Sequence, residues 1–173
     1  MAEEAGTAAA AGESGRMTMV VALDESEHSY YALQWTLRHF FSADGQQQQY
    51  RLAVVNAKPT AASAVGLAGP GITRGAADVL PFVEADLKKS SMRVIDKARE
   101  LCAQVSDAVF EVVEGDARNV LCEAVERHHA EMLVVGSHGY GAIKRAVLGS
   151  VSDYCSHHAH CTVMIVKKPK PKH

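Results

Sequence analysis

Three glycines and a serine near the end of the chain have a spacing that suits the binding of phosphate. The pattern G-x2-G-x9-G-S is formed by Gly136, Gly139, Gly149 and Ser150. Glycines let an anion approach the peptide N–H groups of a loop, and a helix that begins at the last glycine adds the positive end of its dipole. The spacing therefore predicts a site for a phosphate group.

These residues also have a purely structural explanation. Glycines and serines are common where a strand turns into a helix, because they form tight turns and cap the helix. The complete spacing favours phosphate binding over that alternative. Asp24, at the end of an earlier apolar segment, suits either a contact with a ligand or the cap of the helix that follows, a role for which Ser26 is the other candidate. These two roles are compatible.

Short apolar segments alternate along the chain with longer amphipathic ones. Strands are predicted over Met17–Asp24, Arg51–Ala57, Ala108–Gly115, 132–137 and 162–168. Helices are predicted over Glu25–Phe41, 80–105, Asp116–His129 and Ser150–His158. Apolar strands that alternate with helices are typical of a parallel sheet with helices on both faces. The predicted fold is therefore α/β, with an open, twisted, five-stranded parallel sheet as the middle of three layers.

Several polar or glycine positions fall at the carboxyl ends of the predicted strands. Asp24, the turn after Ala57, and Gly136 each lie at such an end. In parallel sheets, ligands bind outside the carboxyl ends of the strands, where the winding direction reverses. Three separate segments therefore meet beside the phosphate site, and we interpret the ligand as a whole nucleotide.

One domain is predicted over residues 16–168, because 173 residues are enough for a single substantial core. Residues 1–15 lack bulky apolar side chains and are expected to be disordered, and residues 169–173 form a basic tail. Inside the domain, residues 58–79 are small, glycine-rich and without periodicity. This stretch predicts a mobile loop that serves either as a lid over the ligand or as a plain connector.

The composition argues against several classes of partner. The formal net charge is −2, so neither nucleic acid nor an anionic membrane is expected to bind. No apolar run reaches the roughly 18–20 residues that cross a bilayer. The first residues carry acids and no base before Arg16, unlike a secretory signal or a transit peptide. We therefore expect a cytoplasmic protein, with access to the nucleus left open.

The remaining reactive side chains are interpreted structurally. His157, His158 and His160 fall at the end of a predicted helix, where cations favour the helix dipole, and this explanation is preferred to a metal site. The cysteines show no CxxC spacing and lie in apolar segments, so we interpret them as reduced core thiols, with a redox role as the alternative. They are Cys102, Cys122, Cys155 and Cys161.

From Thr18 to Lys168 the chain resembles the universal stress protein family, in particular its small plant members with a nucleotide-binding motif. The segment VVGSHGYGAIKRAVLGSVSDYCSHHAHCTVMIVK fits the family's G-x2-G-x9-G-S/T pattern at each defined position. The resemblance implies a sheet in the order 3-2-1-4-5, of the adenine nucleotide alpha hydrolase-like, Rossmann-like type. It also implies a homodimer through the last strand, Thr162–Val166.

The resemblance further implies that the ligand is an adenine nucleotide, either ATP or AMP. Asp24 would accept hydrogen bonds from the ribose or help to position a phosphate-bound metal, for which Mg²⁺ is the candidate. The backbone at Ala57 would meet the adenine ring, and Val135 would lie under the nucleotide. Ala22 would line the same wall, although many relatives have proline there.

For the phosphate end of the ligand, the resemblance implies a role for the glycine pattern. Gly136 and Gly139 would let the loop approach the ribose and the phosphates. Backbone N–H groups and two serine hydroxyls would then bind the phosphates; these residues are Gly149, Ser150, Val151 and Ser152. His138, between the first two glycines, is a candidate contact for a terminal phosphate.

The chemistry for rapid hydrolysis is not visible in the sequence. Phosphoryl transfer requires a Walker-type lysine or an equivalent clamp, and the chain has no G-x4-G-K-S/T motif. The favoured hypothesis is a dimeric regulatory protein that holds a nucleotide, with at most slow ATP hydrolysis and no assigned catalytic residue. The alternatives are an interaction or chaperone-like module that needs no nucleotide and, less favoured, an ATP-consuming enzyme.

Overall fold

The computed structural model describes residues 15–42, 49–66, 76–138 and 148–170. Its elements follow in this order: β1 Met17–Ala22, α2 Glu27–Phe40, β2 Tyr50–Lys58, α3 Ala61–Gly66, α4 Ala76–Leu101, β3 Val109–Glu114, α5 Ala117–Arg127, β4 Met132–Gly136, α6 Ser150–His158 and β5 Thr162–Val166. The strands pair in parallel in the order β3-β2-β1-β4-β5. This confirms the predicted fold class and strand order.

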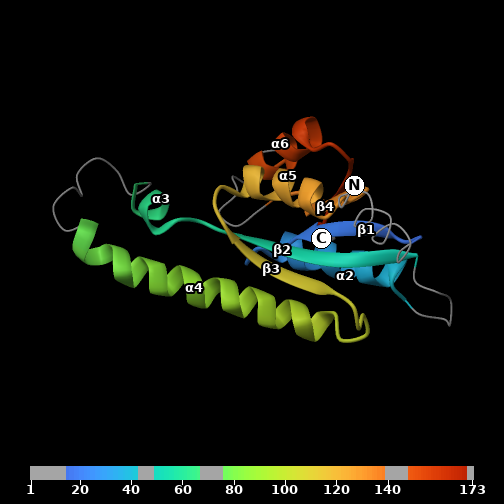
Figure 1. Ribbon diagram of the computed structural model, residues 1–173, viewed down its shortest axis with the longest axis horizontal. Coiled ribbons are helices and arrows are strands. Elements are labelled where there is room, and N and C mark those ends of the chain that lie inside the picture. The colour runs from blue at the N-terminus through green and yellow to red at the C-terminus, as the bar shows by residue number, and fades with distance from the viewer. Residues whose placement is uncertain (1–14, 43–48, 67–75, 139–147, 171–173) are drawn as a thin grey trace, which may run out of the picture.

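The sheet is the middle of three layers (Figure 1). Helices α2 and α4 cover one face, and α5 and α6 cover the other. Side chains of a strand alternate between the two faces. Met19 and Val21 of β1 therefore join the cluster under α2 and α4, whereas Val20 joins the cluster under α5 and α6. Two separate apolar cores hold the helices in place.

The covering helices bury the faces that their apolar periodicity predicts. In α4, Val94 and Ala98 are buried, and Leu87 and Leu101 are half-buried. In α5, periodicity predicts that Val120, Ala124 and either Leu121 or Val125 point inward, and all four of these residues are buried. No helix among the described residues combines the length and the apolar character that crossing a bilayer requires.

The stretch predicted as a loop over residues 58–79 is partly regular. Strand β2 continues to Lys58, α3 occupies Ala61–Gly66, and α4 begins at Ala76 instead of residue 80. Alanine has the highest intrinsic helix propensity, and α3 packs against α4, so a segment without apolar periodicity still forms a helix. Residues 67–75 lie outside the described part of the chain, as do most of the two predicted tails.

Candidate functional site

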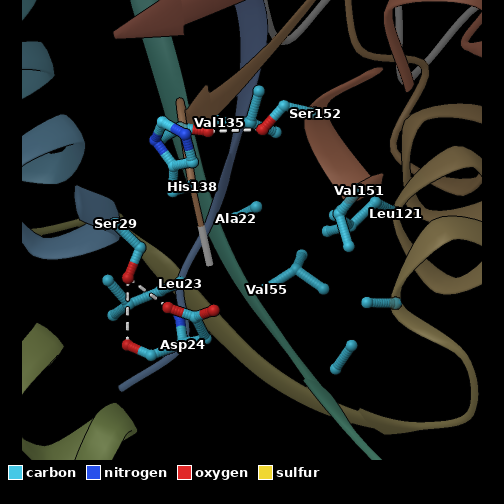
Figure 2. A pocket seen from close by; sticks show the side chains of 13 residues that line it. Ala22, Leu23, Asp24, Ser29, Val55, Leu121, Val135, His138, Val151 and Ser152 are labelled. Atoms are coloured by element: carbon cyan, nitrogen blue, oxygen red, sulfur yellow. Dashed lines mark hydrogen bonds between the residues drawn. The ribbon is translucent and has the colours of Figure 1, made fainter. Parts of the chain in front are cut away.

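A pocket opens at the carboxyl edge of the sheet, and its empty volume of about 480 Å³ includes space that is open to solvent. It lies where β1 and β4 are neighbours and their onward connections lead toward opposite ends of the sheet. Figure 2 shows side chains from both sides of the pocket. The lining residues are Ala22, Leu23, Asp24, Ser29, Val55, Ala57, Ala117, Leu121, Val135, Gly136, His138, Val151 and Ser152.

The pocket gathers most of the residues that the sequence predicted for the site. Those that line it are Ala22, Asp24, Ala57, Val135, Gly136, Val151 and Ser152. Gly149 and Ser150 stand at the start of α6 without lining the pocket, and the side chain of Ser150 is exposed. Gly139 lies outside the described residues. Ala117 and Leu121 of α5 also form a wall, and no motif in the sequence signals that role.

Asp24 is held in a turn between β1 and α2. Its Oδ1 accepts a hydrogen bond of 2.8 Å from the backbone N–H of Ser26. The hydroxyl of Ser29 accepts from the N–H of Asp24, at 3.0 Å. Ser26, not Asp24, is the N-cap of α2, since its side chain accepts from the N–H of Ser29. Asp24 therefore braces the turn and presents its carboxyl group to the pocket (Figure 2).

Two long-range contacts fix the same turn from outside. Asn56, which is only 4% exposed, donates from Nδ2 to the carbonyl oxygen of Leu23, at 2.9 Å. On the other side, the carboxylate of Glu25 accepts from the hydroxyl of Ser90 on α4 and lies 3.5 Å from Arg93. Asn56 carried one signal in the sequence, because it is a polar residue inside an otherwise apolar strand.

Gly136 is required by the close approach of α2 to the end of β4. A Cβ added at this position would lie 2.8 Å from the carbonyl carbon and the carbonyl oxygen of His28. The expected reason for this glycine was approach to a ligand. The geometry adds a second reason, since no larger residue fits under the backbone of α2.

Ser152 binds inside the fold. Its hydroxyl is buried and donates to the carbonyl oxygen of Gly136, at 2.5 Å (Figure 2). The family resemblance implied that this hydroxyl donates to phosphate. The proton of the hydroxyl instead holds the first turn of α6 against the end of β4. The backbone N–H of Ser152 belongs to the first turn of the helix and is not used by that bond.

Helix α6 begins without a side-chain cap. Its N-cap is Gly149, which has no side-chain hydrogen bond to the first turn and whose own N–H donates to the carbonyl oxygen of Ser137, at 2.7 Å. The first N–H groups of an α-helix have no partner within the helix, and they carry the positive end of its dipole. Because Val151 and Ser152 line the pocket, this end of α6 supplies it with positive potential.

A small polar cluster adjoins the pocket at the end of β4. The buried hydroxyl of Ser137 lies 3.1 Å from Nδ1 of His138 and 3.5 Å from Nδ1 of His28. The two imidazole rings are 5.1 Å apart between centroids. His138 lines the pocket, as its place between the glycines suggested, whereas His28 of α2 contacts the ring of His138 and is not among the lining residues.

The two sides of the pocket have opposite electrostatic character. On the β1 side, Asp24 contributes its carboxyl group to the lining of the pocket. On the opposite side, the N-terminal turn of α6 is positive. This arrangement suits a ligand with hydroxyl donors at one end and an anionic group at the other. Among the described residues, no group of three or more His, Cys, Asp or Glu side chains is placed to hold a metal ion.

The strand order, with the pocket between the ends of β1 and β4, places the molecule among doubly wound α/β proteins that bind small ligands where the winding reverses. Comparison with known families then identifies the group within this class. The model of the universal stress protein family matches residues 15–167, and the chain belongs to that family. The resemblance seen in the sequence is thereby confirmed.

Curated relatives agree with this assignment. The chain is 31% identical over 168 residues to Universal stress protein PHOS34 of Arabidopsis thaliana, an alignment that covers 89% of this chain and 63% of the relative. For Universal stress protein PHOS32 of the same plant, the identity is 30% over 164 residues, with 89% and 66% covered. The chain thus spans about two thirds of the length of these two relatives.

Solved structures share the fold. A universal stress protein UspA from Lactobacillus plantarum superposes with a TM-score of 0.67 at 16% identity, covering 87% of this chain and 97% of that one. A universal stress protein family protein from Arabidopsis thaliana with AMP bound superposes with a TM-score of 0.59 at 19% identity, covering 88% and 92%. At these identities the likeness establishes the architecture.

Proposed function

We propose that this protein binds an adenine nucleotide in the pocket between β1, β4 and α6 and acts as a nucleotide-dependent regulatory protein in the stress response. The observation that carries the proposal is that Asp24 and the uncapped start of α6 border the same pocket. Relatives of the same fold support the ligand class, since their structures hold AMP, cAMP or, in a protein from Archaeoglobus fulgidus, dAMP.

The proposed pose follows from the polarity of the pocket. The adenine ring lies between apolar walls and meets the backbone of Ala57, with Ala22 and Val135 as neighbours. The ribose hydroxyls donate to the carboxylate of Asp24. The phosphates lie at the first turn of α6, whose N–H groups bind them as other helix N-termini bind anions. Gly149 and Ser150 contribute through their place at this turn, and Gly139 by letting the loop approach the ligand.

We also propose that the site holds its nucleotide and hydrolyses ATP at most slowly, because the sequence has no Walker-type lysine motif. Any Mg²⁺ is carried by the bound phosphates, and Asp24, which lines the pocket, helps to position it. The choice between ATP and AMP depends on how many phosphates the space beyond the first turn of α6 admits.

We further propose a homodimer that pairs β5 with its copy. Strand β5 is at the end of the sheet, and its central residues, Val163, Met164 and Ile165, are only partly buried. An apolar strand with one unpaired edge is a surface for pairing with another chain. Light scattering combined with size-exclusion chromatography tests the proposal. Met164→Pro, which removes a backbone N–H from the edge strand, shifts the mass to that of one chain.

The proposed compartment is the cytoplasm. All four cysteines are free thiols in the structure: Cys102, Cys122, Cys155 and Cys161. Stable disulfides are rare in reducing compartments and common outside them. A fluorescent fusion imaged in living cells tests this part of the proposal, and secretion of the fusion would contradict it.

The nucleotide site is tested by Asp24→Asn. Asparagine keeps an oxygen that accepts from the N–H of Ser26, so the turn persists, but it loses the charge that attracts the ribose hydroxyls. The expected loss in AMP affinity by isothermal titration is about tenfold, since hydrogen bonds to charged groups contribute roughly 1.5–3 kcal/mol. Asp116→Asn is the matched control, because Asp116 caps α5 without lining the pocket.

The outcomes separate the competing functions. Wild-type protein that binds none of AMP, ADP or ATP in the presence of magnesium would favour the interaction module that needs no nucleotide. Equal loss of affinity in both aspartate variants would place the nucleotide elsewhere. An ATP turnover assay that shows multiple rapid turnovers would favour the enzyme instead.

A further inference from the structure

Three of the four cysteines gather on one side of the sheet. Cys155, on the inner face of α6, is fully buried, whereas Cys122 of α5 and Cys161 before β5 are partly exposed. All three belong to the apolar cluster between α5, α6 and the sheet, which also contains Leu121 of the pocket wall. Cys102 lies in the other core, on the opposite face of the sheet.

Within this group, Cys122 and Cys155 form a polarised pair. Burial is the largest effect and raises the pKa of both thiols, that of Cys155 to about 12. Each thiol also affects the pKa of the other, in opposite directions: Cys155 lowers the pKa of Cys122, whereas Cys122 raises that of Cys155. Cys161 influences Cys155 through its charge alone. Cys122 is partly exposed and Cys155 is fully buried, so an oxidant from solvent reaches Cys122 first.

We infer that Cys122 and Cys155 are an oxidisable thiol pair, which a hydroperoxide converts into a disulfide that joins α5 to α6. The inference rests on their shared cluster, their placement on two helices that pack together, and the exposure of one partner beside the burial of the other. The proposed modification site lies on the two helices that also line the pocket.

The chemistry balances with the hydroperoxide as the oxidant. The thiolate of Cys122 attacks the terminal oxygen of the hydroperoxide and becomes a sulfenic acid, and the O–O bond breaks to release an alcohol, or water from hydrogen peroxide. The sulfur of Cys155 then attacks the sulfur of Cys122, forms the S–S bond and displaces hydroxide, which leaves as water. Two thiols lose two protons and two electrons, and the hydroperoxide is reduced by two electrons.

The reaction is slow at neutral pH and faster in alkali. The thiolate is the nucleophile, and the raised pKa values leave little of it at neutral pH. The pair therefore responds to sustained oxidant and not to a brief pulse. Reduction by dithiothreitol restores both thiols by exchange.

The disulfide would alter the pocket, a step that rests on the proposed function. Helix α5 lines the pocket with Leu121, next to Cys122, and α6 lines it with Ser152, one helical turn before Cys155. An S–S bond of about 2.05 Å is shorter than any non-bonded contact between two sulfurs, so it draws the two helices together. The oxidised protein is expected to bind AMP about threefold or more weakly than the reduced protein, because the pocket narrows.

Mapping the disulfide is the primary test. The reduced protein is exposed to hydrogen peroxide at pH 8, unfolded in denaturant and blocked there with N-ethylmaleimide, and then digested with trypsin without reduction. Trypsin leaves Cys155 and Cys161 in one peptide, residues 146–167, while Cys122 lies in residues 119–127. The experiment therefore uses the Cys161→Ser protein, in which a link between the two peptides has a single assignment.

The expected result is that link, with Cys102 still alkylated by maleimide and the link absent in Cys122→Ser. Cys155→Ala also removes it. The Cys155→Ala variant can fail to fold, because Cys155 is buried. The presence of the disulfide is therefore judged from the peptide map of Cys161→Ser and from the partly exposed Cys122→Ser variant. Maleimide on Cys122 after prolonged peroxide, sulfinic acid there without a link, or a link only between separate chains would overturn the inference.

Nucleotide titration of the same samples separates this inference from the proposed function. Weaker AMP binding after oxidation, reversed by dithiothreitol and absent in Cys122→Ser, supports the coupling between the pair and the pocket. Equal affinity of the two forms would overturn the coupling. If the reduced protein binds no nucleotide, the proposed function fails, while the peptide map still decides whether the thiol pair exists.

Discussion

The hydroxyl of Ser152 donates a 2.5 Å hydrogen bond to the carbonyl oxygen of Gly136, which joins the first turn of α6 to the last residue of β4. A second bond runs beside it, from the N–H of Gly149 to the carbonyl oxygen of Ser137, at 2.7 Å. The two ends of the connection between β4 and α6 are therefore fastened to each other at the border of the pocket, and the start of the helix is fixed there.

Ser152→Ala tests how much this fastening contributes. Removal of a buried hydrogen bond typically costs about 1 kcal/mol of unfolding free energy, and more if the remaining acceptor is left without a partner. Urea denaturation of the variant should show a loss of that size. Ser150→Ala is the matched control, because Ser150 is exposed in the same turn, and its effect should stay within about 0.5 kcal/mol. Equal losses of unfolding free energy in the two variants would show that the hydrogen bond of Ser152 does not stabilise the fold.

Gly136→Ala tests the close contact between β4 and α2. The added methyl group would meet backbone atoms of His28 at 2.8 Å, so the helix or the strand must shift. Overpacking of this kind costs roughly 1–3 kcal/mol, which urea denaturation would measure. The double variant with His28→Ala should be no more stable, because the nearest atoms belong to the backbone. Rescue by that second change would show that the imidazole causes the clash.

Asn56→Asp tests the bond that holds the β1–α2 turn. The replacement removes the donor to the carbonyl oxygen of Leu23 and places a carboxyl group in a buried position. A buried carboxyl group has a raised pKa in the folded state, so the protonated form is favoured and stability increases as the pH falls. Unfolding midpoints at pH 5 and pH 8 should differ more in this variant than in the wild type. Asn56→Leu, which cannot ionise, should lack the additional pH dependence.

The buried thiols predict a loss of stability in alkali. Burial raises the pKa of Cys102 to about 11 and that of Cys155 to about 12, from an ordinary value of 9.0. Since the folded-state pKa is the higher one, the stabilising contribution is complete below pH 9 and is lost as the pH rises through the folded-state values. The loss is on the order of 1 kcal/mol per pH unit for each thiol.

Urea midpoints measured between pH 8 and pH 11 check this prediction. Other groups titrate in the same range, so the informative quantity is the difference between the wild type and Cys102→Ala. That variant should be less stable at pH 8 and should lose stability less steeply as the pH rises. If the urea midpoints of the two proteins fall equally as the pH rises, the fold does not raise the pKa of Cys102.

Much of this architecture could be predicted because it depends on local periodicity. Continuous apolar strands alternate with amphipathic helices, which dictates a parallel sheet covered on both faces. The position of the site could also be predicted, since Asp24, Ala57 and Gly136 lie at the ends of predicted strands and the carboxyl ends of parallel strands share one edge of the sheet. The strand order came from the family resemblance, and the structure confirms it.

The parts that could not be predicted depend on contacts between distant segments. Helix α3 has no apolar periodicity and packs against α4. The bond between Ser90 and Glu25 joins residues from separate elements, and neither residue type identifies the other as its partner. Ser152 was expected to face a ligand, and its hydroxyl instead holds Gly136, because the packing of α6 on β4 sets the direction of that side chain.

The hydrogen bonds around the pocket also have a consequence for the order of folding. Two of them join residues far apart in the chain: 33 positions for Asn56 and Leu23, and 109 for Ser137 and His28. The entropy of closing such loops must be overcome before these contacts form, so they belong to the late stage of folding. During synthesis, a nascent chain that ends before β4 lacks one wall of the pocket. Occupancy by a ligand would therefore report that synthesis and folding of the domain are complete.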